Sequence, residues 1–424
     1  MSFVDNWFNF AGGGRSPWFD FTFGRIEFYF AAVFAFIGLA ALLYGAVKIR
    51  GGKGQVAEFF VFLLVLVVSS LGVVFARNLL LIFICWEVAT FAIWRLVLYY
   101  RDEQSVAAAN WAWFINFAAA TLMLVGMAIL LFEEKTLSLR QLEGVSVSML
   151  PCALILVGIL AKSATLPLYV WMPKAYKAAP APVCALLSGV AENIGVVLFY
   201  KFFVATVKPP EGFLVFVAGL ALVSSIVAGG VAVRAKTTRG ILAYSTISQL
   251  GFIFLGLAMV SYYGLLGGLL YVLAHAVAKS GLFFSIGMVE DASGKTELRA
   301  LGGAARRMPI LAGATAVLMF SVMGLPPMLG FFAKLNVVMA VLRGNLLLGI
   351  GAIVGALFTL FYMARLYSGV FLGTGPADAE WRTTNAFLTA LVVVMALVSL
   401  AGGVAVFLPI RFLEPGVAAV VGAL

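Results

Sequence analysis

Apolar runs of about 20 residues recur from one end of the chain to the other, and they limit its possible folds. One such run, wound as an α-helix, spans the roughly 30 Å hydrocarbon core of a membrane. Transmembrane β-strands would instead show short segments in which apolar and polar residues alternate. Hydrophobic residues make up 63% of the chain and charged residues only 11%, which excludes a water-soluble globular protein. We therefore expect an all-α polytopic membrane protein.

The apolar runs predict about twelve transmembrane helices. Their expected ranges are 27–49, 58–76, 78–100, 108–132, 150–172, 182–205, 212–234, 240–260, 264–289, 309–341, 345–372 and 385–409. The pattern divides the chain into an interfacial N-terminal segment at 1–26, a transmembrane domain at 27–410 and a short C-terminal tail at 411–424. The first segment is rich in aromatic residues and glycine, and we expect no cleavable signal in it.

The formal net charge of +10 comes from basic residues that lie mainly between the apolar runs. In a soluble protein this charge would suggest nucleic acid, but in membrane loops it indicates topology, so we expect a lipid bilayer and no nucleic acid as partner. The loops of one side hold Lys48, Arg50, Lys53, Arg101, Lys174, Lys177, Arg234, Lys236, Arg239, Lys295, Arg299, Arg306, Arg307 and Arg382. Those of the other side hold Arg15, Arg25, Arg77, Lys135, Arg140, Lys201, Lys208, Arg343 and Arg411. The positive-inside rule predicts that the larger set faces the cytoplasm of a prokaryote and that both termini lie outside its inner membrane.

The sequence contains no motif for an energy source or a redox cofactor. It has no Walker sequence, no Gly-x-Gly-x-x-Gly after a strand and no cysteine set for an iron–sulfur cluster. Cys85, Cys152 and Cys184 lie far apart within apolar runs, so we expect neither a metal site nor a disulfide framework. We expect no cofactor and no redox or hydrolytic site in this chain. If it transports ions, the energy comes from an ion gradient or from partner subunits.

Several ionisable side chains lie inside the apolar runs. They are Glu87, Lys162, Glu192, Lys279 and Lys334. A charge near the bilayer centre costs roughly 2.5–3.5 kcal/mol by insertion measurements, so a chain that carries several indicates a pathway for ions or protons. His275, the only histidine, lies one helical turn before Lys279 and on the same helical face. A neutral imidazole accepts and donates at different nitrogens, so His275 is either a proton relay or a hydrogen-bonded core residue.

Proline interrupts two of the expected helices, at Pro167 and at the pair Pro326 and Pro327. A proline inside a helix removes a hydrogen bond and frees carbonyl groups. At membrane depth such backbone is tolerated only inside protein or against a water-filled cavity. Lys162 precedes the first break and Lys334 follows the second, which favours two inverted repeats with ion sites at the membrane midplane. The alternative is a kink that helps packing, with a lysine that extends toward the interface.

Six segments together resemble one known family of membrane subunits. The segments are Trp86–Glu87, Ala161–Pro173, Ala179–Gly189, Leu242–Gly251, His275–Phe283 and Gly324–Lys334. They resemble the antiporter-like subunits shared by respiratory complex I, multi-subunit cation/proton antiporters and membrane-bound hydrogenases. The match covers roughly residues 60–370, most of the chain.

This resemblance implies that Glu87 pairs with Lys162, that Lys279 is the central relay and that Lys334 is the exit-side lysine. A nearby carboxylate favours the charged amine, so moving the Glu87 carboxylate away would let Lys162 release its proton. The resemblance also implies partners: other membrane subunits, related antiporter-like subunits among them, and, in a redox-driven complex, peripheral subunits with iron–sulfur clusters.

We expect three departures from the pattern of the family. Glu87 lies on the third expected helix, whereas the family's matching glutamate lies on the fifth. We also expect no long lateral helix of the kind found at the end of the distal complex I subunit. Asn193 stands where many relatives have a lysine, and an asparagine does not relay protons at neutral pH. A chain of waters or the neighbouring Glu192 would then have to bypass Asn193.

Three functional readings remain open from the sequence. The first is an ion-translocating subunit of a redox-driven membrane complex, and the second is a subunit of a gradient-driven cation/proton antiporter. The third is a scaffold subunit that has lost through-transport, which Asn193 favours and the retained intramembrane charges oppose. A further possibility is coupling of proton flow to inorganic-carbon uptake through a cytoplasmic partner. The lysine-rich line of charges favours protons, because sodium would need several oxygen ligands.

Overall fold

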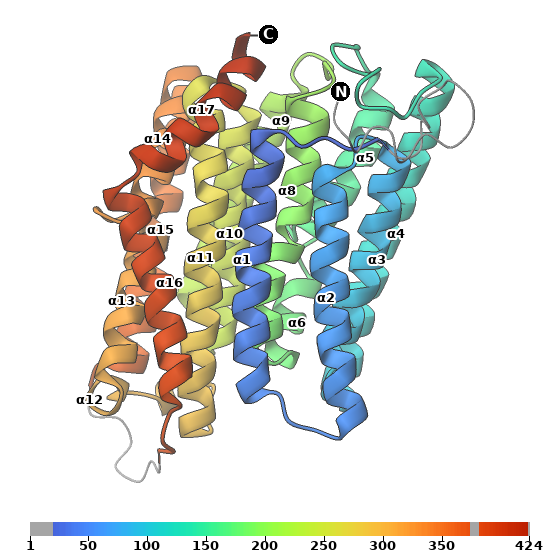
Figure 1. Ribbon diagram of the computed structural model, residues 1–424. Helices are drawn as coiled ribbons and strands as arrows, with labels where there is room; N and C mark the ends of the chain where they lie inside the picture. The colour runs from blue at the N-terminus through green and yellow to red at the C-terminus, as the bar shows by residue number, and fades with distance from the viewer. Residues whose placement is uncertain (1–19, 374–380, 423–424) are drawn as a thin grey trace.

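The computed structural model describes residues 20–373 and 381–422, which form a bundle of long helices with no regular strands in these ranges (Figure 1). The first half contains α1 (Arg25–Lys48), α2 (Lys53–Phe75), α3 (Leu79–Val97), α4 (Glu103–Glu134), α5 (Met149–Lys162), α6 (Trp171–Ala178), α7 (Ala181–Leu186), α8 (Asn193–Phe199) and α9 (Phe213–Arg234). The second half contains α10 (Thr238–Ala258), α11 (Tyr262–Ser293), α12 (Ala304–Arg307), α13 (Pro309–Met323), α14 (Leu329–Gly344), α15 (Leu346–Phe371), α16 (Ala386–Val404) and α17 (Phe407–Gly422). Two π-helical turns, Leu187–Ala191 and Tyr200–Val204, flank α8 and make one continuous helical segment with it and α7.

In the described part of the chain, ten helical segments are long and apolar enough to cross a membrane. Two shorter apolar helices, α5 and α13, each end where a proline-containing segment begins. The protein is thus a multi-pass, all-α membrane protein, as the apolar runs predict. The number of spans and the inverted repeats stay predictions.

Three helical segments form the interior of the bundle. They are the segment Ala181–Val204, α10 and α11. In each of them, 94–100% of the residues in the most apolar stretch are buried. In the other long helices only 33–50% of the residues in the corresponding stretch are buried, and the remaining residues face outward. Apolar residues all round a helix are expected where the helix is enclosed by other helices or lipid. Small residues allow α10 and α11 to approach closely: a Cβ on Gly264 would lie 2.6 Å from the carbonyl oxygen of Gly256.

Both proline-interrupted spans are broken into two helices, not merely kinked. The expected helix at 150–172 consists of α5, which ends at Lys162, and α6, which begins at Trp171. The expected helix at 309–341 consists of α13 and α14, separated by Gly324–Met328. Gly324 ends α13 with a φ of 78°, a left-handed conformation that glycine adopts without strain. The peptide bonds before Pro167 and Pro327 are both cis.

The freed carbonyl groups at the breaks bond to side chains of the protein. The indole nitrogen of Trp171 donates to the Ala161 carbonyl at 2.9 Å, across the first break. At the second break the Lys334 ammonium donates to the Val322 carbonyl at 3.0 Å. Part of the irregular backbone is therefore paired within the protein at both places, while Pro167, Pro326 and Pro327 themselves are exposed on the surface of this chain.

The two ends of the bundle carry the two sets of loops that the basic residues define. Lys48 at the end of α1 pairs with Asp291 of α11 at 2.9 Å. At the opposite end, Arg77 donates its backbone N–H to the carbonyl of Asp20. The start of α1 and the end of α17 lie at this second end together (Figure 1). Which end faces the cytoplasm stays a prediction.

The termini differ from the expected ranges in two details. Much of the segment expected at 1–26 lies outside the described residues, and α1 already begins at Arg25. The residues expected as a tail at 411–424 belong largely to α17, so the expected boundary falls inside a helix. The expected helix at 385–409 likewise ends earlier, with α16 at Val404. The division into domains stays a prediction.

Candidate functional site

Lys162, at the end of α5, contacts α3 one helical turn from Glu87. Lys162 is fully buried, and its ammonium donates a hydrogen bond to the hydroxyl of Thr90 on α3. The same ammonium lies 5.0 Å above the ring of Trp86, within cation–π range. Thr90 is one helical turn from Glu87, whose charge interacts with that of Lys162. Within the described residues no ion pair shorter than 4.0 Å joins the two groups, and one carboxylate oxygen of Glu87 is buried without a hydrogen-bond partner.

Glu192 and Asn193 lie at the junction between the first π-helical turn and α8. Both side chains are fully buried. The Asn193 amide donates to the carbonyls of Ser188 and Gly189, each at 3.2 Å. One carboxylate oxygen of Glu192 accepts a hydrogen bond of 2.7 Å from the Tyr176 hydroxyl, and the other has no hydrogen-bond partner among the described residues. π-helical turns inside α-helices are frequent at functional sites.

His275 and Lys279, one helical turn apart on α11, contact two different neighbouring elements. Lys279 donates to the Leu242 carbonyl at 2.8 Å and to the hydroxyl of Ser245, both on α10. The His275 ring nitrogen Nε2 lies 3.4 Å from the Ser188 hydroxyl, in the π-helical turn that precedes Glu192. Tyr176, which bonds to Glu192, stacks on the ring of Phe283, and the Lys279 ammonium lies 5.7 Å from the centroid of the same ring. The structure therefore brings the central lysine and Glu192 into the same part of the interior, which the sequence alone did not show.

A buried hydrogen-bonded chain continues along α10 and α11 toward α15. The Tyr271 hydroxyl donates to the side-chain oxygen of Gln249. The Gln249 amide in turn donates to Tyr362 at 2.6 Å and to Thr359 at 3.2 Å. Because Tyr271 is one helical turn before His275, the chain extends the polar face of α11 beyond the histidine.

Lys334 is buried at the second helix break, beside this chain. Its ammonium lies 4.9 Å from the ring of Phe252 and 5.8 Å from that of Tyr271. It also donates to the carbonyls of Val322 and Met323, the last two residues of α13. Pro326 and Pro327 thus end a half-helix whose exposed carbonyls receive the lysine, just as Pro167 follows the half-helix that ends in Lys162.

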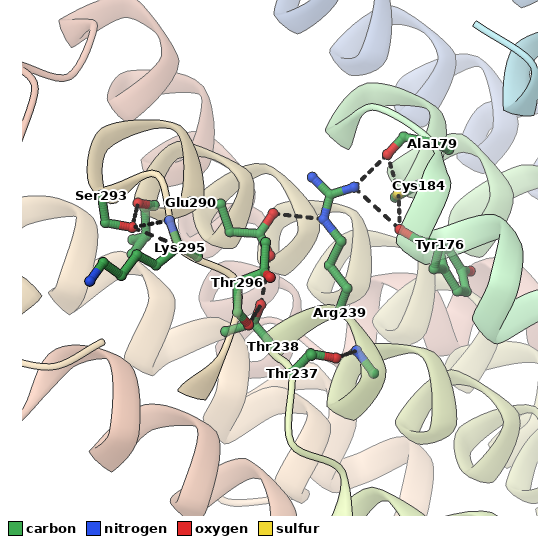
Figure 2. A network of polar contacts seen from close by, with 12 residues as sticks. Tyr176, Ala179, Cys184, Thr237, Thr238, Arg239, Glu290, Ser293, Lys295 and Thr296 are labelled. Carbon is green, nitrogen blue, oxygen red and sulfur yellow. Dashed lines mark hydrogen bonds and ion pairs between the residues drawn. The ribbon is translucent and has the colours of Figure 1, made fainter. Parts of the chain in front are cut away.

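Three functional candidates were missed by the sequence reasoning. Tyr176 gave no signal, because a tyrosine near the end of an apolar run is common at a membrane interface. Lys201 was counted among the loop charges, but it is buried and donates to the carbonyls of Val73, Val74 and Ala76 at the end of α2. Arg239 was also counted as a loop charge, yet it forms a nearly buried ion pair of 2.6 Å with Glu290 (Figure 2).

Comparison with known families decides the identity of the chain. Residues 76–359 match the family described as "NADH:quinone oxidoreductase/Mrp antiporter, TM". The chain belongs to this family. The resemblance expected from Trp86–Glu87, His275–Phe283 and the other segments is confirmed.

Relatives of this family member come from two kinds of complex. Over 379 residues the chain is 29% identical to NADH-quinone oxidoreductase subunit N of Desulforudis audaxviator, covering 86% of this chain and 75% of that one. Over 360 residues it is 29% identical to Na(+)/H(+) antiporter subunit A1 of Staphylococcus saprophyticus, covering 76% of this chain and 44% of that one. The chain thus spans less than half the length of this antiporter subunit.

Solved structures show the same fold. A chain of the Mrp complex from Dietzia sp. superposes with a TM-score of 0.87 at 24% identity, covering 96% of this chain and 86% of that one. At this identity the likeness shows the fold alone. A chain of an archaeal respiratory complex, the membrane-bound sulfane sulfur reductase, superposes with a TM-score of 0.80 at 27% identity, covering 90% and 64%.

Proposed function

We propose that this chain moves protons across a membrane as the antiporter-like subunit of a multi-subunit complex. One observation carries the proposal: a line of ionisable side chains lies in the enclosed centre of the bundle and beside two broken helices. The buried members are Lys162, Glu192, His275, Lys279 and Lys334. Burying charges at membrane depth costs free energy, and a subunit that only docks its neighbours has no use for them. A scaffold role alone therefore does not explain these buried side chains.

Glu87 and Lys162 form the first, coupling part of the path. Thr90 holds the Lys162 ammonium on the side of α3 that carries Glu87. A change in the charge or position of Glu87 alters the electrostatic potential at the Lys162 amine, and this changes how strongly the amine binds its proton. Because Glu87 is only half-buried on α3, a partner subunit against this helix can influence it.

Glu192 replaces Asn193 as the link between Lys162 and the central lysine. Asn193 donates its amide protons to backbone carbonyls, so it is fixed and carries no exchangeable charge. The adjacent Glu192 does carry one, and it bonds to Tyr176, which shares the Phe283 ring with Lys279. Ser163, next to Lys162, donates to the Glu192 backbone carbonyl at 2.8 Å, so the two regions lie in direct contact.

His275, Lys279 and Lys334 form the second half of the path. Hydroxyl and amide groups lie between Lys279 and Lys334, with Ser245 at one end and the pair Tyr271 and Gln249 at the other. Such groups hydrogen-bond the waters that proton hopping requires. Three amines against two carboxylates make this line unsuited to sodium, which prefers several oxygen ligands.

The names of the relatives fit a redox-driven complex and a gradient-driven antiporter alike. We favour the redox-driven complex, with other membrane subunits, related antiporter-like subunits and peripheral iron–sulfur subunits as partners. Its place would be the inner membrane of a prokaryote, with the end that carries Lys48 and Arg239 in the cytoplasm.

Purification of the intact complex from its own membrane tests both parts of this proposal. Reconstituted in vesicles with a pH-sensitive dye, the working complex should produce a pH change that a protonophore abolishes. Mass analysis of its subunits should find iron–sulfur or nickel-containing partners if the complex is redox-driven. Only small membrane partners would favour the gradient-driven antiporter, and a working complex without any proton movement would leave the scaffold reading.

A further inference from the structure

Tyr176 joins the Glu192 carboxylate to the basic end of the bundle. The Tyr176 side chain is fully buried, and its hydroxyl donates a 2.7 Å hydrogen bond to one oxygen of Glu192. The second Glu192 oxygen is buried without a hydrogen-bond partner among the described residues. Buried polar atoms are nearly always paired, so an unpaired carboxylate oxygen beside a held one marks where a proton can be taken up.

Tyr176 and Lys279 both lie near the ring of Phe283. Tyr176 stacks on this ring with 4.6 Å between the ring centroids. The Lys279 ammonium lies 5.7 Å from the centroid of the same ring. The Tyr176 hydroxyl that bonds to Glu192 and the Lys279 ammonium therefore belong to side chains that contact one aromatic ring.

Arg239 fixes the backbone that carries Tyr176. Figure 2 shows the guanidinium between the Glu290 carboxylate and the carbonyl groups of Tyr176 and Ala179. Glu290 is held in turn by the Thr238 hydroxyl at 2.6 Å. This buried ion pair therefore ties the segment between α6 and α7 to the start of α10 and the end of α11.

We propose that Tyr176 is a positioning residue that holds the Glu192 carboxylate toward Lys279, and that Arg239 and Glu290 keep Tyr176 in place. This inference rests on the proposed proton path and adds to it the group that orients its central carboxylate. A fixed Tyr176 hydroxyl leaves one carboxylate oxygen for proton exchange and prevents rotation of the group away from the amine. Misplacement of a reacting group by about 1 Å can cost a hundredfold in rate.

Tyr176→Phe in the intact complex tests the hydroxyl without changing the ring. Proton movement per turnover should fall at least about tenfold. The infrared band of protonated Glu192 should also shift, and its loss in Glu192→Gln assigns this band. Incorporation of 4-aminophenylalanine at position 176 restores a hydrogen-bond donor in the same place, so it should restore the proton movement and the band position. Wild-type transport and an unshifted band in Tyr176→Phe would overturn the positioning role.

Tyr44→Phe is the matched control. Tyr44 is also buried and stacks on a phenylalanine, Phe284, at 4.5 Å, but its hydroxyl donates to the Phe284 carbonyl and not to an acid. It should transport at the wild-type rate per assembled complex. An equal loss in Tyr44→Phe would reduce the effect of Tyr176→Phe to a general loss of packing and overturn the proposal.

Glu290→Gln removes the charge of the ion pair and keeps the size of the side chain, and its single amide oxygen can accept only one of the two hydrogen bonds that Thr238 and Arg239 donate. It should shift the Glu192 band in the same direction as Tyr176→Phe and lower transport by a smaller factor. An unshifted band would overturn the role of the ion pair. Lys279→Met, measured beside these variants, separates the two proposals. If Lys279→Met lowers proton transport and Tyr176→Phe does not, only the positioning role is wrong. If neither variant lowers proton transport, the proposed proton path is wrong.

Discussion

Lys162, the last residue of α5, donates a hydrogen bond to Thr90, one helical turn from Glu87 on α3. This contact joins the end of α5 to the helix that carries Glu87, and α3 turns part of its surface outward. The pairing of Glu87 with Lys162 itself stays a prediction.

Glu87→Gln should lower proton transport at least about tenfold while the complex still assembles, because the charge that acts on Lys162 is gone but the shape is kept. The measurement is proton movement per turnover in vesicles, normalised to assembled complex. Glu103→Gln, which removes an exposed carboxylate from the first turn of α4, is the matched control and should behave as wild type. A Glu87→Gln complex that assembles and transports at the normal rate would exclude the coupling role.

Asn193→Lys should be tolerated. The Asn193 amide donates to the carbonyls of Ser188 and Gly189, and a lysine ammonium at the same position has donors for both. Transport should stay within about twofold of wild type, whereas Glu192→Gln should lower it at least tenfold, a typical loss for a missing acid–base group. If Asn193→Lys abolished transport while Glu192→Gln preserved it, the bypass through Glu192 would be wrong.

Lys201→Met should lower stability but not transport. The Lys201 ammonium bonds to the last carbonyls of α2, a structural role that basic residues often have at helix ends. Leaving buried carbonyls unpaired costs about 1–3 kcal/mol, so the complex should unfold at a lower temperature in detergent. Transport per assembled complex should be unchanged. A transport loss without a stability loss would instead add Lys201 to the proton path.

The single chain should be inactive when it is expressed alone. Its sequence has no cofactor motif, and α3, which carries Glu87, has an outward face to which a partner can dock. Vesicles that hold only this chain should show neither redox activity nor more ion exchange than empty vesicles. Strong exchange by the purified chain would contradict the proposal that it works only within an assembly.

Much of the fold could be predicted because membrane-spanning helices leave a direct trace in the sequence. Apolar runs located the long helices, and Pro167 and Pro326 located the breaks, since no local context restores the missing helix hydrogen bonds. The sequence did not show that α6 is a separate helix or that Tyr200–Val204 is π-helical. Both features depend on how the neighbouring helices pack against the irregular backbone.

The candidate site was predictable in its charges and not in its contacts. A lysine or glutamate inside an apolar run is visible, because its burial is costly. Its partner is not visible when the partner is a common residue, as with Thr90 beside Lys162 or Tyr176 beside Glu192. Arg239 lies at the very start of α10, so only tertiary packing distinguishes this buried side chain from a loop charge.

The most direct test of the account is proton movement by the intact complex with Lys279→Met. Lys279 is the buried amine that bonds to α10 and lies near the Phe283 ring on which Tyr176 stacks, so the proposed route through the centre of this chain passes it. Lys53→Met, which removes an exposed charge at the start of α2, is the control. We expect proton movement through this chain to fall to background in Lys279→Met, with normal assembly and normal transport in Lys53→Met. A Lys279→Met complex that moves as many protons per turnover as wild type would contradict the account.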